Sequence, residues 1–222
     1  MDTSGGKLDE LQKRVLGSLA AVRPPFILGG GAALAGVHLA HRKTRDLDLF
    51  WREKTQFGDI PQLIESRLTN EGLTVSPLQR SPSFVELRVA DASSVVVVDL
   101  IAEPTSSLEP PRLCRIGRSD ILVDTAHAIL TEKLCALLGR SEVRDLVDVE
   151  ALVRSGEDLS SAVADAPRRD SGFSPLTLAW VLRDWDVRSI ALSAGLSDAD
   201  AETLERFRQS LIDRLITPEP AA

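Results

Sequence analysis

Two aspartates at alternate positions of one segment are the residues of this chain whose types and spacing point most directly to chemistry. Asp46 and Asp48 stand in Arg45-Asp46-Leu47-Asp48-Leu49-Phe50, where polar and apolar residues alternate as in a half-buried strand. Residues two apart on a strand project from the same face, so the two carboxylates should lie side by side. Neighbouring anions repel each other unless a cation lies between them. The segment therefore predicts a metal site built from carboxylate oxygens.

Asp99 is the candidate for a third carboxylate of this site. It stands near the end of an expected strand, 94–101, which is β-branched from Val95 to Val98 and should lie in the middle of a sheet. If this strand neighbours the first, three carboxylates converge and can hold two Mg²⁺ ions roughly 3.5–4 Å apart for a displacement at phosphorus. Oxygen ligands favour Mg²⁺, with Mn²⁺ as a substitute, over softer metals. The alternative is that Asp46 and Asp48 form the solvated face of an edge strand.

Three consecutive glycines, 29–31, precede the aspartates. They follow a short apolar segment, 26–28, and introduce an Ala-rich segment, 32–40, that should be helical. Backbone N–H groups at the start of a helix bind phosphate, although the same glycines can also form a flexible turn without a ligand. A basic run, 41–45, adjoins the aspartates. The candidate nucleotide contacts in this part of the chain are Gly30, Gly31, Ala32 and Arg45.

The elements that must position these residues divide the chain into an α/β region, 1–122, and a helical region, 123–222. In the α/β region we expect helices at 7–22, 32–40 and 59–71, and strands at 26–28, 46–51, 73–78, 83–89 and 94–101, the last two paired as an antiparallel hairpin. In the helical region we expect four helices. The first covers 124–138 and is capped by Asp124 or Thr125, and the second covers 141–153 and is capped by Ser141. The third begins at Ser174-Pro175, with Trp180 and Trp185 in the core, and the fourth runs from Ser197 to about Ile216.

Composition restricts the class of protein. The chain has 222 residues, a net charge of −7 and two cysteines, Cys114 and Cys135, which lack metal-ligand spacing and are typical of a reducing compartment. No apolar run is long enough to span a membrane, and the start of the chain has no export signal, so we expect a cytoplasmic protein without a membrane partner. The acidic balance disfavours a general nucleic-acid binder.

The combination of motifs resembles the nucleotidyltransferase superfamily that includes polymerase-β-like enzymes. Within it, the chain is most similar to the AbiEii/AbiGii abortive-infection toxins of type IV toxin–antitoxin pairs. The resemblance rests first on Gly30-Gly31-Ala32-Ala33-Leu34 and on the run from His41 to Phe50 that contains both aspartates. Its second part is Lys133-Leu134-Cys135-Ala136-Leu137, followed by Arg144-Asp145-Leu146-Val147-Asp148-Val149. It covers residues 26–153, and 155–222 carry no motif that we can assign.

The resemblance implies an α+β, polymerase-β-like nucleotidyltransferase fold followed by a helical region. It also implies Mg²⁺-dependent transfer of a nucleoside monophosphate from a nucleoside triphosphate to a tRNA 3′ end, by a toxin with a separately encoded antitoxin. Asp46 and Asp48 would bind the metal with Asp99, which would also deprotonate the acceptor hydroxyl. Lys133 or Arg144 would neutralise phosphate charge, and Asp148 would support the active site. The family's hydroxyl residue after the paired glycines is replaced by Ala32.

Other functions fit the same residues. Lys133 could be an ordinary solvated lysine, and Arg144 with Asp148 a surface pair that contributes about 0.2–0.5 kcal/mol. Ala32 favours a nucleotide-binding module that has lost transfer activity. The acidic net charge fits transfer to a small molecule, such as an aminoglycoside, or to a protein side chain better than it fits tRNA.

Overall fold

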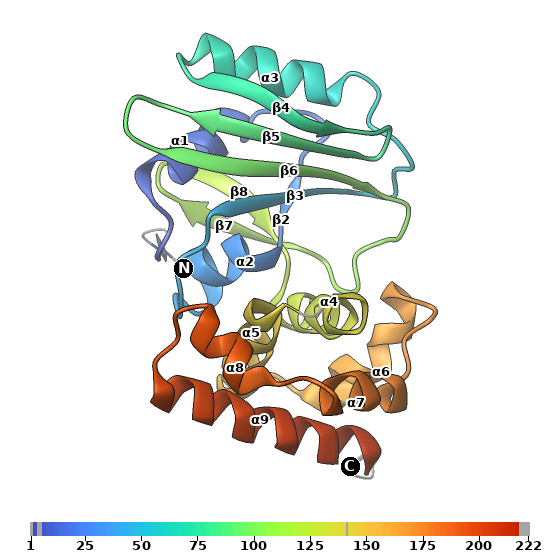
Figure 1. The fold of residues 1–222 in the computed structure, drawn as a ribbon. Helices are drawn as coiled ribbons and strands as arrows, with labels where there is room; N and C mark the ends of the chain where they lie inside the picture. Colours follow the sequence, from blue (N-terminus) through green and yellow to red (C-terminus); the bar gives the residue numbers. More distant parts are fainter. Residues whose placement is uncertain (1, 4–5, 141, 218–222) are drawn as a thin grey trace. The chain divides into compact units, whose positions relative to one another are not determined.

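The computed structural model describes residues 2–3, 6–140 and 142–217 (Figure 1). The chain divides into two compact units, Met1–Thr125 and Ala126–Ala222. The first unit contains a mixed sheet and its helices, and the second unit is helical, so the α+β class predicted from the sequence is confirmed.

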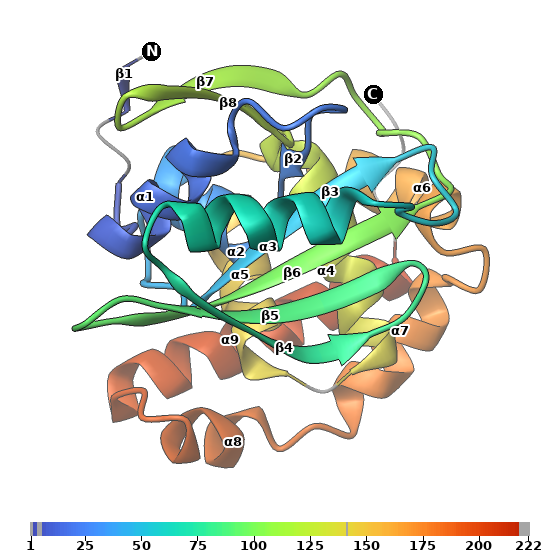
Figure 2. The same ribbon diagram turned by 90° about the horizontal axis from the view of Figure 1, so that it is seen from above.

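Within the described residues, the sheet of the first unit has the strand order β1-β7-β8-β2-β3-β6-β5-β4 (Figure 2). Strands β3 and β6 are parallel, whereas β6 pairs with β5 in the expected antiparallel hairpin. The strands are β1 (Asp2–Thr3), β2 (Ile27–Leu28), β3 (Asp46–Arg52), β4 (Thr74–Arg80), β5 (Phe84–Ala90), β6 (Val95–Glu103), β7 (Arg112–Ile116) and β8 (Ser119–Val123).

Alternation of buried and half-buried residues gives β3 and β6 one apolar and one polar face. Leu47, Leu49, Val98 and Leu100 are fully buried, and the residues between them, including both aspartates of β3, are half-buried. Helices α1 (Glu10–Leu19) and α3 (Ile60–Asn70) pack against each other and against strands of the sheet (Figure 2).

Both sequence-based statements about the position of the aspartates need correction. Strand β3 lies between β2 and β6, so Asp46 and Asp48 are not on an edge strand. Asp99 is not near the end of its strand, because β6 continues for four residues beyond it to Glu103. The prediction that the β-branched strand is internal is confirmed, since β6 lies between β3 and β5.

The helical elements at the glycines differ from the expected single helix at 32–40. Helix α2 begins earlier, at Gly30, and ends at Ala33, and a π-helical turn (η1) continues from Leu34 to His38. Helix α1 is shorter than the expected 7–22, because Asp9 caps it by accepting from the Gln12 N–H, while the Gln12 side chain accepts from the Asp9 N–H.

The second unit consists, within its described residues, of α4 to α9. Ser197 caps the last of these helices by accepting from the Asp200 N–H, as its position in the sequence predicted. Ser141, the expected cap of the second helix, lies outside the described residues. The helices are α4 (Ala126–Gly139), α5 (Val143–Arg154), α6 (Leu159–Arg169), α7 (Pro175–Arg183), α8 (Val187–Ser193) and α9 (Asp198–Ile216).

The expected core position of Trp180 is wrong. Its side chain lies on the outer face of α7 and is 64% exposed, with the Arg183 guanidinium 5.9 Å from the ring centre. Trp185 is buried, but it follows α7 rather than forming part of it. In the described part of the chain, no helix combines the length and apolar character that a membrane span needs.

Candidate functional site

The glycine turn packs directly on the polar face of β3. Strands β2 and β3 are antiparallel, and the Gly29 N–H donates to the Asp48 carbonyl oxygen at 3.0 Å. A Cβ at Gly30 would lie 2.0 Å from Asp48 Oδ2, and one at Gly29 would lie 2.6 Å from a Phe50 ring carbon. Gly30 also has φ +55°, which residues with a Cβ rarely adopt. The turn therefore needs glycines because side chains of β3 occupy the space of a Cβ.

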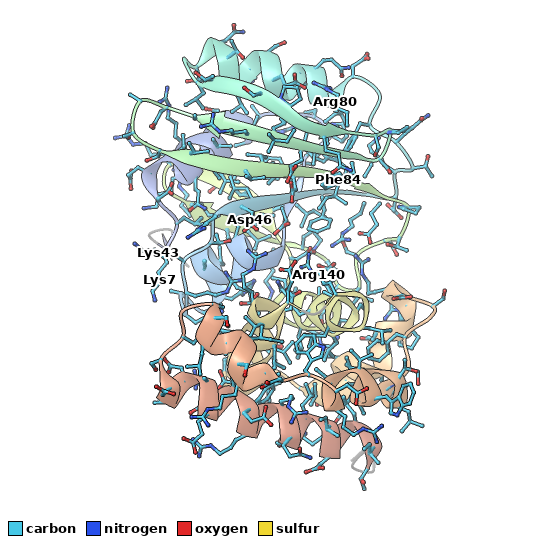
Figure 3. All side chains as sticks on the ribbon, in the orientation of Figure 1. Lys7, Lys43, Asp46, Arg80, Phe84 and Arg140 are labelled. Carbon is cyan, nitrogen blue, oxygen red and sulfur yellow. The ribbon has the colours of Figure 1, made fainter. Side chains whose placement is uncertain are left out.

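Asp46, Asp48 and Asp99, the candidate metal ligands, lie on one face of the sheet. The parallel register of β3 and β6 places Asp48 opposite Asp99 and Asp46 opposite Val97. All three residues are half-buried, and Figure 3 labels Asp46 between β3 and α2. Thr44 donates a hydrogen bond from its hydroxyl to the Asp46 carboxylate, and Asp99 Oδ1 is buried. The structure thus places the carboxylates that the sequence analysis selected on the same face of two paired strands.

These carboxylates do not form a ready-made metal cage. Within the described residues, no group of three or more His, Cys, Asp or Glu side chains is placed to hold a metal ion. Mg²⁺ is commonly bound by one or two carboxylates, with water and substrate phosphates completing its shell. The donor set of Asp46 and Asp48 beside the Gly30 backbone fits an ion that arrives with a triphosphate.

The sequence analysis did not select two further residues, one beside the turn and one beside Asp99. A Cβ at Gly31 would lie 3.1 Å from an Arg42 guanidinium nitrogen, so Arg42, rather than the exposed Arg45, approaches the glycines. Glu86 of β5 lies opposite Asp99 in the antiparallel register and extends the row of carboxylates by one strand. The signal for Arg42 is its place in the basic run 41–45 beside the aspartates. Glu86 carries no such signal, because its position opposite Asp99 depends on strand pairing.

Ala32 is fully buried. A hydroxyl residue at this position would therefore have its side chain in the protein interior. The N–H groups of the turn are the polar groups that this stretch can offer to a phosphate.

In the second unit, Lys133 is the centre of a buried ionic cluster. Its Nζ lies 2.7 Å from Asp145 Oδ1 and 2.9 Å from Asp148 Oδ2. Burial acts to lower the pKa of Lys133, but the charges and hydrogen bonds of Asp148 and Asp145 outweigh it and hold the pKa above its usual value. Lys133 is therefore a buried, charged lysine, and the alternative of an ordinary solvated lysine is wrong.

The same cluster corrects the interpretation of the motif in α5. Asp148 is fully buried and pairs with Lys133, so it is not a surface residue as the surface-pair alternative requires. Arg144 is exposed, and its Nη2 lies 2.7 Å from Glu142 Oε2. Asp145 was not selected from the sequence, yet its carboxylate binds both Lys133 and Arg140, whose Nε is 2.8 Å away. Its position three residues before Asp148, on the same side of a helix, was the available signal.

Comparison with known proteins gives both a family and a fold. The family model described as "Nucleotidyl transferase AbiEii toxin, Type IV TA system" matches residues 14–219. No curated protein sequence matches the chain significantly. The MenT4 nucleotidyltransferase toxin (Rv2826c) of Mycobacterium tuberculosis H37Rv is similar in structure, with a TM-score of 0.67 and 17% identity over 91% of this chain and 82% of that chain.

Structures from Helicobacter pylori show the same fold. A protein described as a nucleotidyltransferase has a TM-score of 0.56 and 19% identity, over 96% of this chain and all of the other. The protein JHP933 has a TM-score of 0.52 and 19% identity, over 93% of this chain and 91% of the other. The family match covers most of the chain and includes the glycine turn, the aspartate strand and the lysine cluster. The chain belongs to the AbiEii family of nucleotidyltransferase toxins of type IV toxin–antitoxin systems.

Proposed function

We propose that this nucleotidyltransferase moves a nucleoside monophosphate from a nucleoside triphosphate to the 3′ hydroxyl of tRNA in a Mg²⁺-dependent reaction. The observation that carries the proposal is the register of Asp48 with Asp99 on one sheet face, beside a glycine turn that approaches the Asp48 carboxylate. Carboxylates next to backbone N–H groups suit a metal–triphosphate substrate.

The residues of the first unit have distinct proposed roles. The N–H groups of Gly30, Gly31 and Ala32 bind phosphate oxygens, and Asp46 and Asp48, with Asp99, hold the metal. Mg²⁺, or Mn²⁺ in its place, supplies stabilisation of the charge that develops on the phosphate oxygens. Asp99 accepts the proton of the acceptor hydroxyl. The hydroxyl oxygen then bonds to the α-phosphorus, the bond from that phosphorus to the bridging oxygen breaks, and pyrophosphate leaves.

Cations are needed to neutralise the triphosphate, and we propose Lys133 for this role. Asp145 and Asp148 keep its ammonium charged and fix its position, which supports the role of Asp148 as a residue that acts through Lys133. Arg45 and Arg144 are exposed and are proposed as additional contacts to the nucleotide. The type IV family implies a separately encoded antitoxin that opposes the toxic effect, and we infer one for this chain.

A second candidate function is transfer to a small molecule or to a protein side chain. The net charge of −7 supports it, because an acidic protein gains little from general attraction to RNA. The alternative of nucleotide binding without transfer rests on Ala32. The full burial of Ala32 weakens this alternative, because the residue contributes no exposed side chain to the turn.

Labelled nucleoside triphosphates separate these functions. The protein is incubated with each of the four α-labelled triphosphates, Mg²⁺ and a cell extract that is then divided into tRNA, protein and small-molecule fractions. We expect label in tRNA, with pyrophosphate release, and none after chelation of the metal. Label in another fraction would overturn the proposed acceptor, and nucleotide binding without label in any fraction would overturn transfer.

A further inference from the structure

A buried ionic cluster lies at the C-terminal end of β3, whereas Asp46 is at the N-terminal end of the same strand. Arg52, whose side chain is 5% exposed, forms ion pairs with Glu103 of β6 and with Asp124, which follows β8. Its Nη2 lies 2.9 Å from Asp124 Oδ2. The guanidinium also lies over the Phe50 ring, 4.2 Å from the ring centre. One arginine thus joins three strands of the sheet and an aromatic ring.

This cluster contacts the glycine turn through two side chains. The space that a Cβ would occupy at Gly29 is bordered by the Phe50 ring at 2.6 Å and by Asp124 Oδ2 at 3.1 Å. The backbone of Asp124 is fixed as well, because its N–H donates to the Leu28 carbonyl at 3.0 Å. His38 Nε2 lies 2.8 Å from the Asp124 carbonyl oxygen and connects it to the end of η1. The elements before and after the turn therefore meet at Asp124.

The charge of Arg52 matters for a turn that is to bind phosphate. The Asp124 carboxylate is buried next to Gly29, and a carboxylate without a compensating cation would repel an approaching phosphate. Arg52 forms a direct ion pair with this carboxylate and lies over the Phe50 ring, which borders Gly29. Removing the guanidinium would leave Asp124 and Glu103 without the cation that both bind.

We propose that Arg52 is a positioning residue for nucleotide binding: with Asp124 and Phe50, it fixes the glycine turn and offsets the negative charge of Asp124 beside it. The inference rests on the proposed binding of the triphosphate at this turn. It predicts that Arg52 affects the affinity for nucleotide much more than the rate of transfer, because Arg52 pairs with Asp124, whose carboxylate borders Gly29 of the phosphate-binding turn.

The test measures equilibrium binding of Mg²⁺–nucleoside triphosphate, together with KM and kcat, for Arg52→Gln in the full chain. The matched control is Arg169→Gln. Arg169 has the same 5% side-chain exposure and a half-buried partner, Glu132, whose Oε1 lies 2.8 Å from Arg169 Nη2, but it belongs to the second unit. We expect Kd and KM for the triphosphate to rise about tenfold in Arg52→Gln, with kcat changed less than about threefold, and both constants to stay unchanged in Arg169→Gln.

Two more variants keep the test decisive if Arg52→Gln is poorly folded. Adding Asp124→Asn to Arg52→Gln removes the uncompensated charge, and we expect it to restore most of the lost affinity. Phe50→Leu keeps an apolar side chain against Gly29 but removes the ring, and we expect a smaller rise in Kd. Unchanged Kd in a folded Arg52→Gln protein, or equal losses in Arg169→Gln, would overturn the inference. The Kd is measured directly, so the test of Arg52 does not depend on turnover. If the protein binds nucleotide but transfers none, the proposed transfer is contradicted, whereas the Kd values still show whether Arg52 contributes to binding.

Discussion

At the scale of single residues, Lys133 has the environment with the largest expected effect on stability. It is buried between Asp145 and Asp148, so a neutral substitute removes a cation that two buried carboxylates share and leaves Asp145 with Arg140. We expect Lys133→Met to lower the free energy of unfolding by about 3–5 kcal/mol, measured by urea denaturation at pH 7. The control is Lys13→Met, since Lys13 pairs with the exposed Glu10 and should cost less than about 1 kcal/mol. Equal losses in the two variants would contradict the buried cluster.

Cys135 gives a prediction about pH. Burial raises the pKa of its thiol from the usual 9.0 to about 11, and the charge of Asp170 adds to the rise. Because the folded-state pKa is the higher one, the stabilising contribution is complete below pH 9 and is lost as the pH rises toward 11. Over this pH range, we expect the free energy of unfolding to fall by about 1 kcal/mol more in the wild type than in Cys135→Ala. This figure allows for the partial exposure of the Cys135 side chain, which reduces the effect of the pKa shift.

Urea denaturation at a series of pH values between 8 and about 11 measures this difference. Cys114→Ala serves as the control, because burial raises the pKa of the Cys114 thiol to a smaller extent. The same pH profile in Cys135→Ala and the wild type would show that the Cys135 thiol does not titrate differently in the folded protein.

At the scale of elements, the strand–turn–helix unit of β2, the glycines and α2 depends on close contact with β3. Gly30→Ala should place a methyl group against the Asp48 carboxylate and force a left-handed conformation on a residue with a Cβ. Gly58→Ala is a matched control, because Gly58 has φ +62° and no neighbouring atom within 4 Å of a Cβ. Both variants should lose roughly 1–2 kcal/mol from backbone strain.

Only Gly30→Ala should lose nucleotide transfer and binding, because only its methyl group displaces a proposed metal ligand. Thermal unfolding and the transfer assay, measured on the same preparations, distinguish strain from displacement. Transfer activity in Gly30→Ala equal to that in Gly58→Ala would contradict the importance of this contact.

The elements that could be predicted are those with a strong local pattern. Strict alternation in 46–51 and the β-branched run at 95–98 correspond to β3 and β6. The hairpin of β7 and β8 was missed because its alternation is weak and Arg112, Arg115 and Arg118 dominate its composition. Helices α6 and α8 were missed too, since Pro167 stands inside the first and the second is seven residues long.

The candidate site shows the same division. Spacing along one strand identified Asp46 and Asp48, because a strand fixes the direction of alternate side chains. Glu86, Arg52 and Asp124 come from separate strands or strand ends, and their proximity to the site depends on register and strand order. Lys133 could be selected by resemblance alone, because its burial depends on how α4 and α5 pack.

At the scale of the whole molecule, the family match extends from residue 14 to residue 219 and so includes both compact units. The chain carries the aspartates and glycine turn in its first unit and the lysine cluster in its second. We propose that transfer requires both sets of residues. Residues 155–219 belong to the matched range, although they hold none of the motif residues.

The most direct measurement is the rate of label transfer from a nucleoside triphosphate by Asp48→Asn, compared with the wild type and with Asp120→Asn. Asp120 is a matched control because it lies on β8 of the same sheet and pairs with Arg115 at the surface. The account predicts a loss of at least about 100-fold in Asp48→Asn, and wild-type transfer in Asp120→Asn. Transfer by a folded Asp48→Asn protein at the wild-type rate would contradict the proposed site.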